Sequence, residues 1–177
     1  ISRHPGVRKV IIESRAEYVT DKALRIIRDS FGGLLEVGIG LESVNPEVRE
    51  LCHHKNLPDL NTVLDAVGTL KANGFRSLLY VNQKPPFLTE KEAIEDAAES
   101  ALWAYESGAD AVSIEPTSLQ PNTLADHLYE LGLFRVPWLW SVREVARNVI
   151  NGAGRRVDLR IGGYFDGEVL SGSQGAA

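Results

Sequence analysis

Short apolar runs alternate along this chain with longer segments in which apolar residues recur at helical spacing. The runs are rich in β-branched residues and lie at residues 7–12, 34–39, 77–81 and 111–114, with a weaker run at 157–161. A strand-length apolar run followed by an amphipathic helical pattern is typical of the repeated unit of parallel sheets. The pattern therefore predicts an α/β fold in which parallel strands alternate with helices.

The predicted helices have recognisable start and stop signals. Thr20 and Thr89 are N-cap residues in front of helical patterns, and Pro46 occupies the first position of another helix. The segment after Thr89 is the strongest predicted helix because its first turn is acidic and its apolar residues recur at helical spacing. Gly74 is a predicted helix C-cap directly before the third strand.

Polar residues follow each of the first four predicted strands directly. The carboxyl ends of parallel strands share one edge of a sheet, so we expect these residues to line one cavity. In strand order they are Glu13, Ser14 and Arg15; Glu42 and Ser43; Asn82, Gln83 and Lys84; and Glu115, Pro116 and Thr117. This mixture of carboxylates, amides and a lysine suits a zwitterionic, ribose-bearing ligand better than a bare phosphate.

Composition narrows the function classes. The net charge of -5 argues against general electrostatic attraction to nucleic acid, so an RNA substrate would need a partner or a missing domain. No apolar run reaches the roughly 20 residues that span a bilayer, and no signal pattern opens the chain, so we expect a cytoplasmic protein without membrane contact. Cys52 is the single cysteine, and the adjacent His53 and His54 would point in different directions on a helix, so no metal site is predicted.

Five stretches of the chain resemble a known family. I-I-E-S-R-A-E-Y-V-T and L-E-V-G-I-G-L-E-S-V-N-P-E-V-R-E resemble the third and fourth βα units of radical-SAM enzymes of the elongator and methylthiotransferase type. K-P-P-F-L-T-E-K-E-A-I-E-D-A, G-A-D-A-V-S-I-E-P-T and P-W-L-W-S-V-R-E-V resemble the radical-SAM subunit of archaeosine synthase. The resemblance covers about residues 10–149 and implies a partial TIM-type (β/α) barrel.

The resemblance also implies a domain arrangement. The 177 residues are too few for a complete barrel of roughly 250, and the chain begins with Ile1 and contains no Met, so we expect it to be part of a longer protein. Residues 1–150 would form the later βα units, and residues 151–177 a last strand and a flexible tail. A barrel without its first units has an uncovered sheet edge, so we expect the isolated segment to associate or to be poorly soluble.

The activity that the resemblance implies is radical S-adenosylmethionine chemistry in tRNA modification, such as archaeosine formation. Members of the family hold a [4Fe–4S] cluster through Cys-x-x-x-Cys-x-x-Cys, and S-adenosylmethionine binds the open iron. That motif is absent here and is expected upstream of Ile1, so the isolated chain would be inactive. The partner implied is a tRNA-guanine transglycosylase-like subunit that attaches lysine to the base.

Site residues follow from the resemblance by motif, and they leave the catalytic residues unassigned. Glu13, Glu42 with Ser43, and Lys55 match cofactor-binding positions, with His54 as the alternative to Lys55. The complete set of predicted cofactor ligands is Glu13, Arg15, Glu42, Ser43, Lys55, Asn82 and Lys84, and the predicted substrate ligands are Glu115 and Thr117. Relatives read N-K-G-F where this chain has H-K-N-L, which removes a glycine from the loop after Lys55.

Two further interpretations remain open. A catalytically inactive barrel scaffold or binding subunit would keep the fold without the chemistry. An aldolase-like lyase would use Lys84 as an imine-forming amine. Trp138 and Trp140 would stack on a nucleobase in an RNA enzyme, but aromatic residues beside a helix start are expected to pack in the core.

Overall fold

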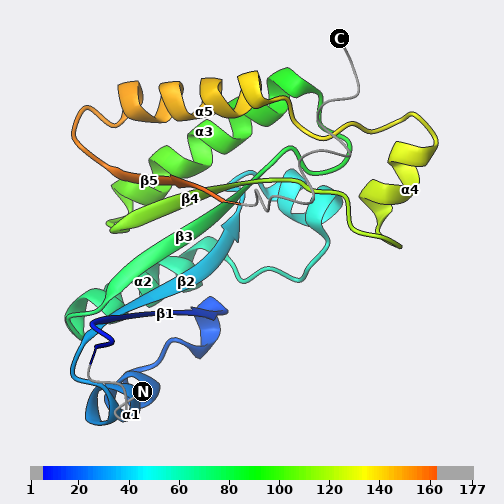
Figure 1. Ribbon diagram of the computed structural model, residues 1–177. Helices are drawn as coiled ribbons and strands as arrows, with labels where there is room; N and C mark the ends of the chain where they lie inside the picture. Colours follow the sequence, from blue (N-terminus) through cyan, green and yellow to red (C-terminus); the bar gives the residue numbers. More distant parts are fainter. Residues whose placement is uncertain (1–5, 163–177) are drawn as a thin grey trace.

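The computed structural model describes residues 6–162, which form one five-stranded parallel sheet with helices between the strands (Figure 1). The strands are β1 (Lys9–Ser14), β2 (Leu34–Glu42), β3 (Arg76–Gln83), β4 (Ala111–Pro116) and β5 (Asp158–Ile161), and they lie in the order β1-β2-β3-β4-β5. Each strand pairs in parallel with the next one along the chain. The predicted α/β fold with parallel strands is confirmed.

Seven helical segments connect the strands. They are η1 (Ala16–Tyr18), α1 (Asp21–Ser30), the π-helical turn η2 (Val48–His53), α2 (Leu60–Ala72), α3 (Glu90–Glu106), α4 (Leu124–Glu130) and α5 (Leu139–Gly152) among the residues described. The Thr20 side chain accepts a hydrogen bond from the Ala23 amide, and Thr89 forms a capping box with Glu92. Gly74 has a φ of 71° just after α2, so these predicted helix ends are confirmed.

The first four strands extend further at their carboxyl ends than the apolar runs predict. β1 begins at Lys9 rather than at residue 7, and the first four strands end at Ser14, Glu42, Gln83 and Pro116. The predicted positions of Glu13, Glu42, Asn82 and Glu115 after the strands are therefore wrong, because these residues occupy the last strand positions. Polar residues continue a strand here because alternate side chains point to opposite faces of the sheet.

One face of the sheet packs against helices and forms the core. β2 contributes Leu35, Val37, Ile39 and Leu41 to it, at every second position. The α3 residues in this core include Ala97, Ala101 and Ala104, whose small side chains let the helix lie close to the strands. Helix α5 packs against α3, and its Val145 and Val149 belong to the same core as the strand residues (Figure 1).

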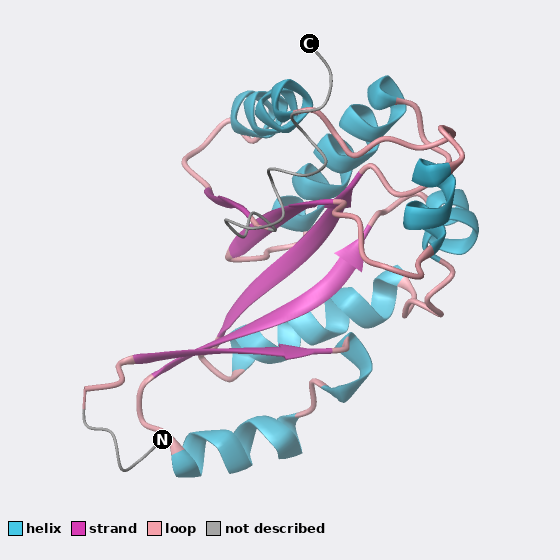
Figure 2. Ribbon diagram, turned by 45° about the vertical axis from the view of Figure 1, so that its right-hand side comes forward, coloured by secondary structure: helices cyan, strands magenta, loops and turns pink. Residues whose placement is uncertain are grey.

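The opposite face carries charged and polar residues, and we call it the inner face. Near the amino ends of the strands, Glu36 of β2 is fully buried and accepts hydrogen bonds from Lys9, Arg76 and Arg160. Arg160 lies on β5, yet its Nη1 is 2.6 Å from Glu36 Oε1 with β3 and β4 between them. In a flat sheet, three strand spacings would separate these backbones by roughly 14 Å. The sheet therefore curves around the inner face, as the strands in Figure 2 show.

The prediction that Trp138 and Trp140 pack in the core was wrong. Their exposed fractions are 50% and 74%, because the buried side of α5 is formed by Ser141, Val142, Val145 and Val149. The predicted last strand is β5, which pairs with β4, whereas the predicted flexible tail falls at residues 163–177, outside the described residues. Within residues 6–162, no helix is long and apolar enough to span a membrane.

Candidate functional site

Three carboxylates lie on the inner face near the carboxyl ends of the strands. Glu42 is the last residue of β2, and Glu13 and Glu115 each come one residue before the end of β1 and β4. Burial raises the pKa of Glu115, and the negative charges of Glu42 and Glu13 raise it further, although Ser113 donates a hydrogen bond of 2.7 Å to its carboxylate. The three residues form what we call the carboxylate cluster, in which the charges repel one another and favour a cationic ligand.

Tyr80 joins the carboxylate cluster from β3. Its hydroxyl donates a hydrogen bond of 3.3 Å to Glu13 Oε1, across the intervening strand β2. The ring passes above Gly38, where a Cβ atom would lie 2.6 Å from Tyr80 Cε2. Burial raises the pKa of Tyr80, and the neighbouring Glu13 carboxylate adds to the increase, so the hydroxyl stays protonated and remains a donor. Glycine at position 38 is thus required for this contact.

The end of β2 holds Glu42 in an unusual backbone conformation. Glu42 has a φ of 65°, and the Ser43 amide donates to the Leu41 carbonyl at 2.9 Å, which makes a tight three-residue turn. Arg49 Nη1 donates to the carbonyl oxygens of both Leu41 and Ser43, at 2.6 and 2.7 Å, and stabilises the turn. A positive φ at a non-glycine residue is uncommon and is often found at functional sites.

The loop after η2 brings a cation to the carboxylate cluster. Lys55 Nζ lies 3.3 Å from Glu42 Oε1, and Arg15 donates to the Asn56 carbonyl at 2.7 Å. Asn56 has a φ of 49° at the position where relatives of the resembled family have glycine. Asparagine adopts this left-handed conformation more readily than most other residues, so it replaces that glycine. Arg15 and Lys55 are therefore brought to the same edge of the site.

Asn82 and Thr117 meet at the ends of β3 and β4. The Thr117 hydroxyl lies 3.1 Å from both Asn82 Oδ1 and the Gln83 carbonyl oxygen. Asn82 is paired in register with Glu115, which places this contact beside the carboxylate cluster. Seven of the nine predicted ligands are thus gathered at one end of the inner face: Glu13, Arg15, Glu42, Lys55, Asn82, Glu115 and Thr117.

Ser43 and Lys84 turn toward α3 instead. The buried Ser43 hydroxyl donates to Asp96 Oδ1 at 2.6 Å, and Lys84 Nζ lies 2.8 Å from Glu90 Oε2. Lys84 also donates to the Arg135 carbonyl at 2.7 Å. An imine-forming amine must be neutral and free to reach a substrate, whereas Lys84 is held in an ion pair. The geometry therefore gives the aldolase-like interpretation no support.

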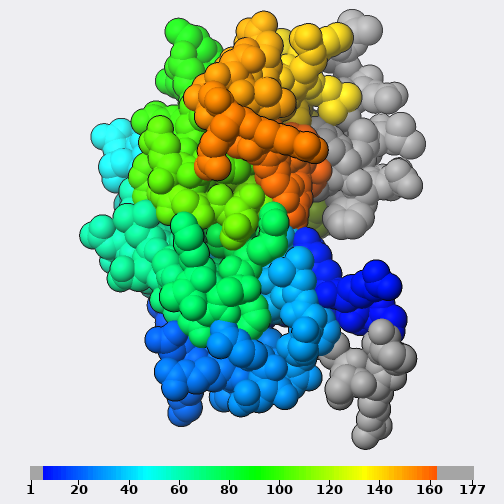
Figure 3. All heavy atoms as spheres, turned by 90° about the vertical axis from the view of Figure 1, so that its left-hand side faces the viewer, coloured from blue at the N-terminus to red at the C-terminus, as the bar shows by residue number. Residues whose placement is uncertain are grey.

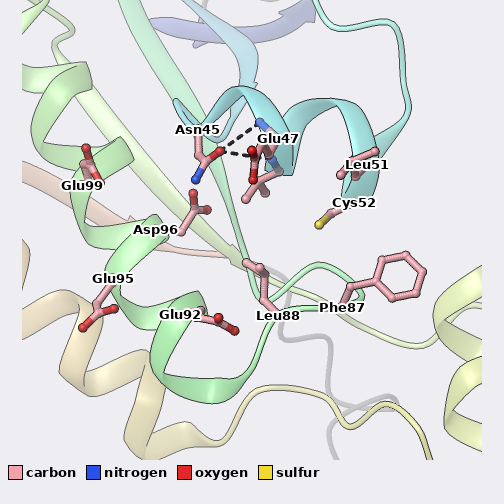
Figure 4. Close-up of a pocket in the computed structure, with 11 residues that line it drawn as sticks. Asn45, Glu47, Leu51, Cys52, Phe87, Leu88, Glu92, Glu95, Asp96 and Glu99 are labelled. Atoms are coloured by element: carbon pink, nitrogen blue, oxygen red, sulfur yellow. Dashed lines mark hydrogen bonds between the residues drawn. The ribbon is translucent and has the colours of Figure 1, made fainter.

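An acidic groove of about 680 Å³ lies on the helix side, between η2 and the start of α3 (Figure 4). It is lined by Asn45, Glu47, Val48, Leu51, Cys52, Phe87, Leu88, Glu92, Glu95, Asp96 and Glu99. None of the predicted ligands lies in this lining. Asn45 Oδ1 accepts hydrogen bonds from the amides of Glu47 and Val48 and so caps the turn at the rim of the groove.

Among the described residues, no group of three or more His, Cys, Asp or Glu side chains could hold a metal ion. Burial raises the pKa of the Cys52 thiol, which disfavours the thiolate. Burial also lowers the pKa of His53 to about 4, with smaller contributions from Lys55 and Arg49. These neighbouring residues are therefore a neutral imidazole and a neutral thiol at pH 7.

Sequence reasoning missed Tyr80 and Glu36. Tyr80 lies within an apolar strand run, and only its spacing of two from Asn82 indicates that both face the same side. The glycines of G-I-G in β2 carry a further signal, because two glycines at alternate positions leave room for a side chain from the next strand. Glu36 is a charged residue within an apolar run. A charged side chain that is buried there needs partners of opposite charge, and the sequence does not identify them.

Known proteins share both the sequence and the fold. No family model matches the chain. Archaeosine synthase subunit beta of Thermococcus kodakarensis is 38% identical over 144 residues, which is 79% of this chain and 43% of the relative. Archaeosine synthase subunit beta of Methanosarcina acetivorans is 33% identical over 151 residues, 83% of this chain and 42% of the relative. An uncharacterised protein of Methanocaldococcus jannaschii is 31% identical over 149 residues, 84% of this chain and 40% of that protein.

Among solved structures, Elp3 of Methanocaldococcus infernus has a TM-score of 0.60 at 20% identity and covers 88% of this chain and 35% of its own. The radical S-adenosylmethionine methyltransferase TsrM of Kitasatospora setae has a TM-score of 0.53 at 10% identity, over 72% of this chain and 24% of its own. These likenesses concern the fold. The chain spans less than half the length of the curated relatives it matches.

Proposed function

The chain is a homologue of archaeosine synthase subunit beta with the α/β fold of radical-SAM structures, and from this premise we propose that it forms the later βα units of a radical S-adenosylmethionine enzyme that modifies tRNA. The carboxylate cluster of Glu13, Glu42 and Glu115 is the observation that carries the proposal. The roles that we propose for the other predicted ligands follow from their positions relative to this cluster.

The chemistry of the carboxylate cluster fits S-adenosylmethionine. That molecule has a sulfonium and an ammonium group, both cationic, and two ribose hydroxyls that donate hydrogen bonds. Carboxylates accept hydrogen bonds from hydroxyls and attract cations, so Glu13 and Glu42 suit the ribose and the amino group. Lys55 would form an ion pair with the carboxylate of the methionine part, and its contact with Glu42 keeps it at the edge of the carboxylate cluster. Burial is the largest cause of the raised pKa of Glu115, and binding of a cation would offset the further contribution from the charges of Glu42 and Glu13.

The remaining predicted ligands have secondary roles in this proposal. Arg15 orients the loop that carries Lys55, and Asn82 with Thr117 lies on the side of the carboxylate cluster where Glu115 would meet the substrate. Ser43 and Lys84 hold the strand ends against α3 rather than contact the cofactor. When bound, S-adenosylmethionine with a reduced [4Fe–4S] cluster would supply the radical chemistry, and the residues of this chain would hold the S-adenosylmethionine in place.

The residues of this chain do not fit the iron–sulfur cluster itself. A cluster of this type needs several thiolates, and the 177 residues contain one cysteine. The cluster ligands would come from outside this chain. We also propose a cytoplasmic location, a tRNA substrate and a second subunit of the tRNA-guanine transglycosylase type, as the relationship with an archaeosine synthase subunit suggests.

The test uses the full-length protein that contains this chain, reconstituted with iron and sulfide without oxygen. We expect the visible absorbance of an iron–sulfur cluster, and 5'-deoxyadenosine released from S-adenosylmethionine after reduction. Glu42→Gln should weaken S-adenosylmethionine binding and lower 5'-deoxyadenosine release, whereas Glu130→Gln on the exposed end of α4 is the matched control. A colourless protein that binds no S-adenosylmethionine would contradict the proposal and assign the chain to the scaffold interpretation.

A further inference from the structure

Trp138 and Trp140 are exposed to solvent at the start of α5, and the guanidinium group of an arginine lies over the ring of each. The Arg135 guanidinium lies 5.3 Å from the centre of the Trp138 ring, and that of Arg143 lies 5.9 Å from the centre of the Trp140 ring. Arg147 is one helical turn after Arg143 on the same side of α5 and is also exposed. We call Arg135, Trp138, Trp140, Arg143 and Arg147 the Trp–Arg surface; α5 lies at the molecular surface in Figure 3.

The charge of this region is opposite to that of the whole chain. Residues 131–156 contain five arginines and one acidic residue, Glu144, which gives a formal charge of +4 in a chain of net charge -5. None of the five cations is a lysine. Arginine is the residue best suited to phosphate groups, because its guanidinium presents several donors in a planar fork. Although the whole chain is acidic, residues 131–156, which include the two exposed tryptophans, are therefore basic.

Specific contacts fix the Trp–Arg surface at the carboxyl ends of the strands. Lys84, which directly follows β3, donates to the Arg135 carbonyl at 2.7 Å. Glu90, its ion-pair partner, accepts a hydrogen bond of 3.0 Å from the Trp138 amide. Since Asn82 is only two residues before Lys84, Arg135 and Trp138 of the Trp–Arg surface lie at the same end of the sheet as the carboxylate cluster.

We propose that the Trp–Arg surface binds single-stranded nucleotides of the RNA substrate next to the base that is modified. This inference rests on the proposed function, because it concerns the same site and its tRNA substrate. Exposed aromatic rings stack on unpaired bases, and arginines stack on bases or contact the phosphates between them. The exposed Leu131 and Leu133 beside this surface would also suit a protein partner, but the three arginines of the surface, of which only Arg147 pairs with an acid, Glu144, within the described part of the chain, favour a polyanion.

The experiment measures binding of a tRNA transcript to the full-length protein by fluorescence anisotropy over a range of salt concentrations. Trp140→Ala should weaken binding roughly tenfold without changing the salt dependence, because a stacking contact releases no counterions. Arg143→Ala and Arg147→Ala should each lower the slope of log affinity against log salt by about one. The matched controls are Ile26→Ala and Arg25→Ala on the exposed side of α1, which should change neither quantity.

Each outcome separates this inference from the proposed function. Unchanged tRNA affinity in Trp140→Ala and Arg143→Ala would overturn the inference, and loss of subunit assembly in the same variants would assign this surface to a protein partner. Both variants should still bind S-adenosylmethionine normally, because neither residue contacts the carboxylate cluster. Failure of Glu42→Gln to affect S-adenosylmethionine binding would instead count against the proposed function and leave the RNA measurements interpretable.

Discussion

The Tyr80 hydroxyl reaches over strand β2 to donate a hydrogen bond of 3.3 Å to the Glu13 carboxylate. Two strands that are not neighbours in the sheet are thereby joined at the candidate cofactor site. The contact depends on Gly38, above which the tyrosine ring lies. It also orients Glu13, because the carboxylate otherwise has the rotational freedom of an exposed glutamate side chain.

Gly38→Ala should break this contact. The new Cβ would lie 2.6 Å from the Tyr80 ring, so the tyrosine would turn away at a stability cost of about 1 kcal/mol. Chemical denaturation measures the cost, and S-adenosylmethionine affinity should fall in the same variant. Gly68→Ala is the matched control: it lies on the exposed side of α2 with no atom near its new Cβ, and it should raise stability by about 0.5–1 kcal/mol. Equal effects of the two substitutions would contradict this account.

Glu36→Gln should destabilise the protein at pH 7 by roughly 1–3 kcal/mol, because three cations lose their shared buried anion. Burial alone would raise the pKa of Glu36, but hydrogen bonds from Arg160 and Lys9 outweigh it and lower the pKa to about 2. A depressed pKa adds stability above the unfolded value of 4.5, and that stability is lost as the pH falls toward 2. Denaturation from pH 5 to pH 2 should therefore show a steeper decline of stability in the wild type than in the variant, whose other carboxyl groups with lowered pKa values still titrate there.

Lys84→Met should loosen the segment before α5. It leaves Glu90 without its ion-pair partner and removes the donor to the Arg135 carbonyl, so we expect a loss of about 2–4 kcal/mol. Hydrogen exchange should accelerate at residues 132–138 and not in α2. The double variant Lys84→Met with Glu90→Gln should recover part of the stability, since it no longer leaves a charge unpaired. Additive losses in the double variant would mean that the two residues act independently.

S-adenosylmethionine affinity should depend on pH through Glu115. Burial and the charges of Glu42 and Glu13 raise its pKa above the ordinary 4.5, so the carboxyl is partly protonated just above that pH. A cationic ligand favours the ionised form, and affinity should therefore rise with pH through the raised pKa and then level off. Titration calorimetry should show a weaker pH dependence for S-adenosylhomocysteine, which lacks the sulfonium charge. Glu115→Gln should remove the difference; if it persists, Glu115 is not the titrating group.

The sequence predicts the strands and most of the gathered ligands because both follow from periodicity. Apolar runs locate the strands, and Glu13, Glu42 and Glu115 fall at their carboxyl ends, which meet at one edge. The direction of a side chain is harder to predict from the sequence. Ser43 and Asn82 are both polar residues at strand ends, yet only Ser43 turns toward α3. Strand alternation accounts for Ser43, which comes two residues after Leu41 of the core, but not for Lys84, whose φ of 62° ends the alternation of β3.

The contacts that the sequence could not predict are those between distant strands. Tyr80 and Glu36 find partners across intervening strands, and such distances depend on the curvature of the sheet. Trp138 and Trp140 show a different limit, because their hydrophobicity indicated burial while the α5 positions that face the protein are occupied by valines and a serine.

The sequential strand order has a consequence for folding kinetics. Because every strand pairs with the next one along the chain, each βα unit can dock on the preceding unit at a low entropic cost of loop closure. The contact between Glu36 and Arg160 is one of the exceptions, since it joins residues 124 positions apart. We expect such a contact to form after the folding transition state, so its removal should accelerate unfolding while the folding rate stays nearly constant. The Glu36–Arg160 pair would then lower the unfolding rate and so lengthen the lifetime of the folded sheet.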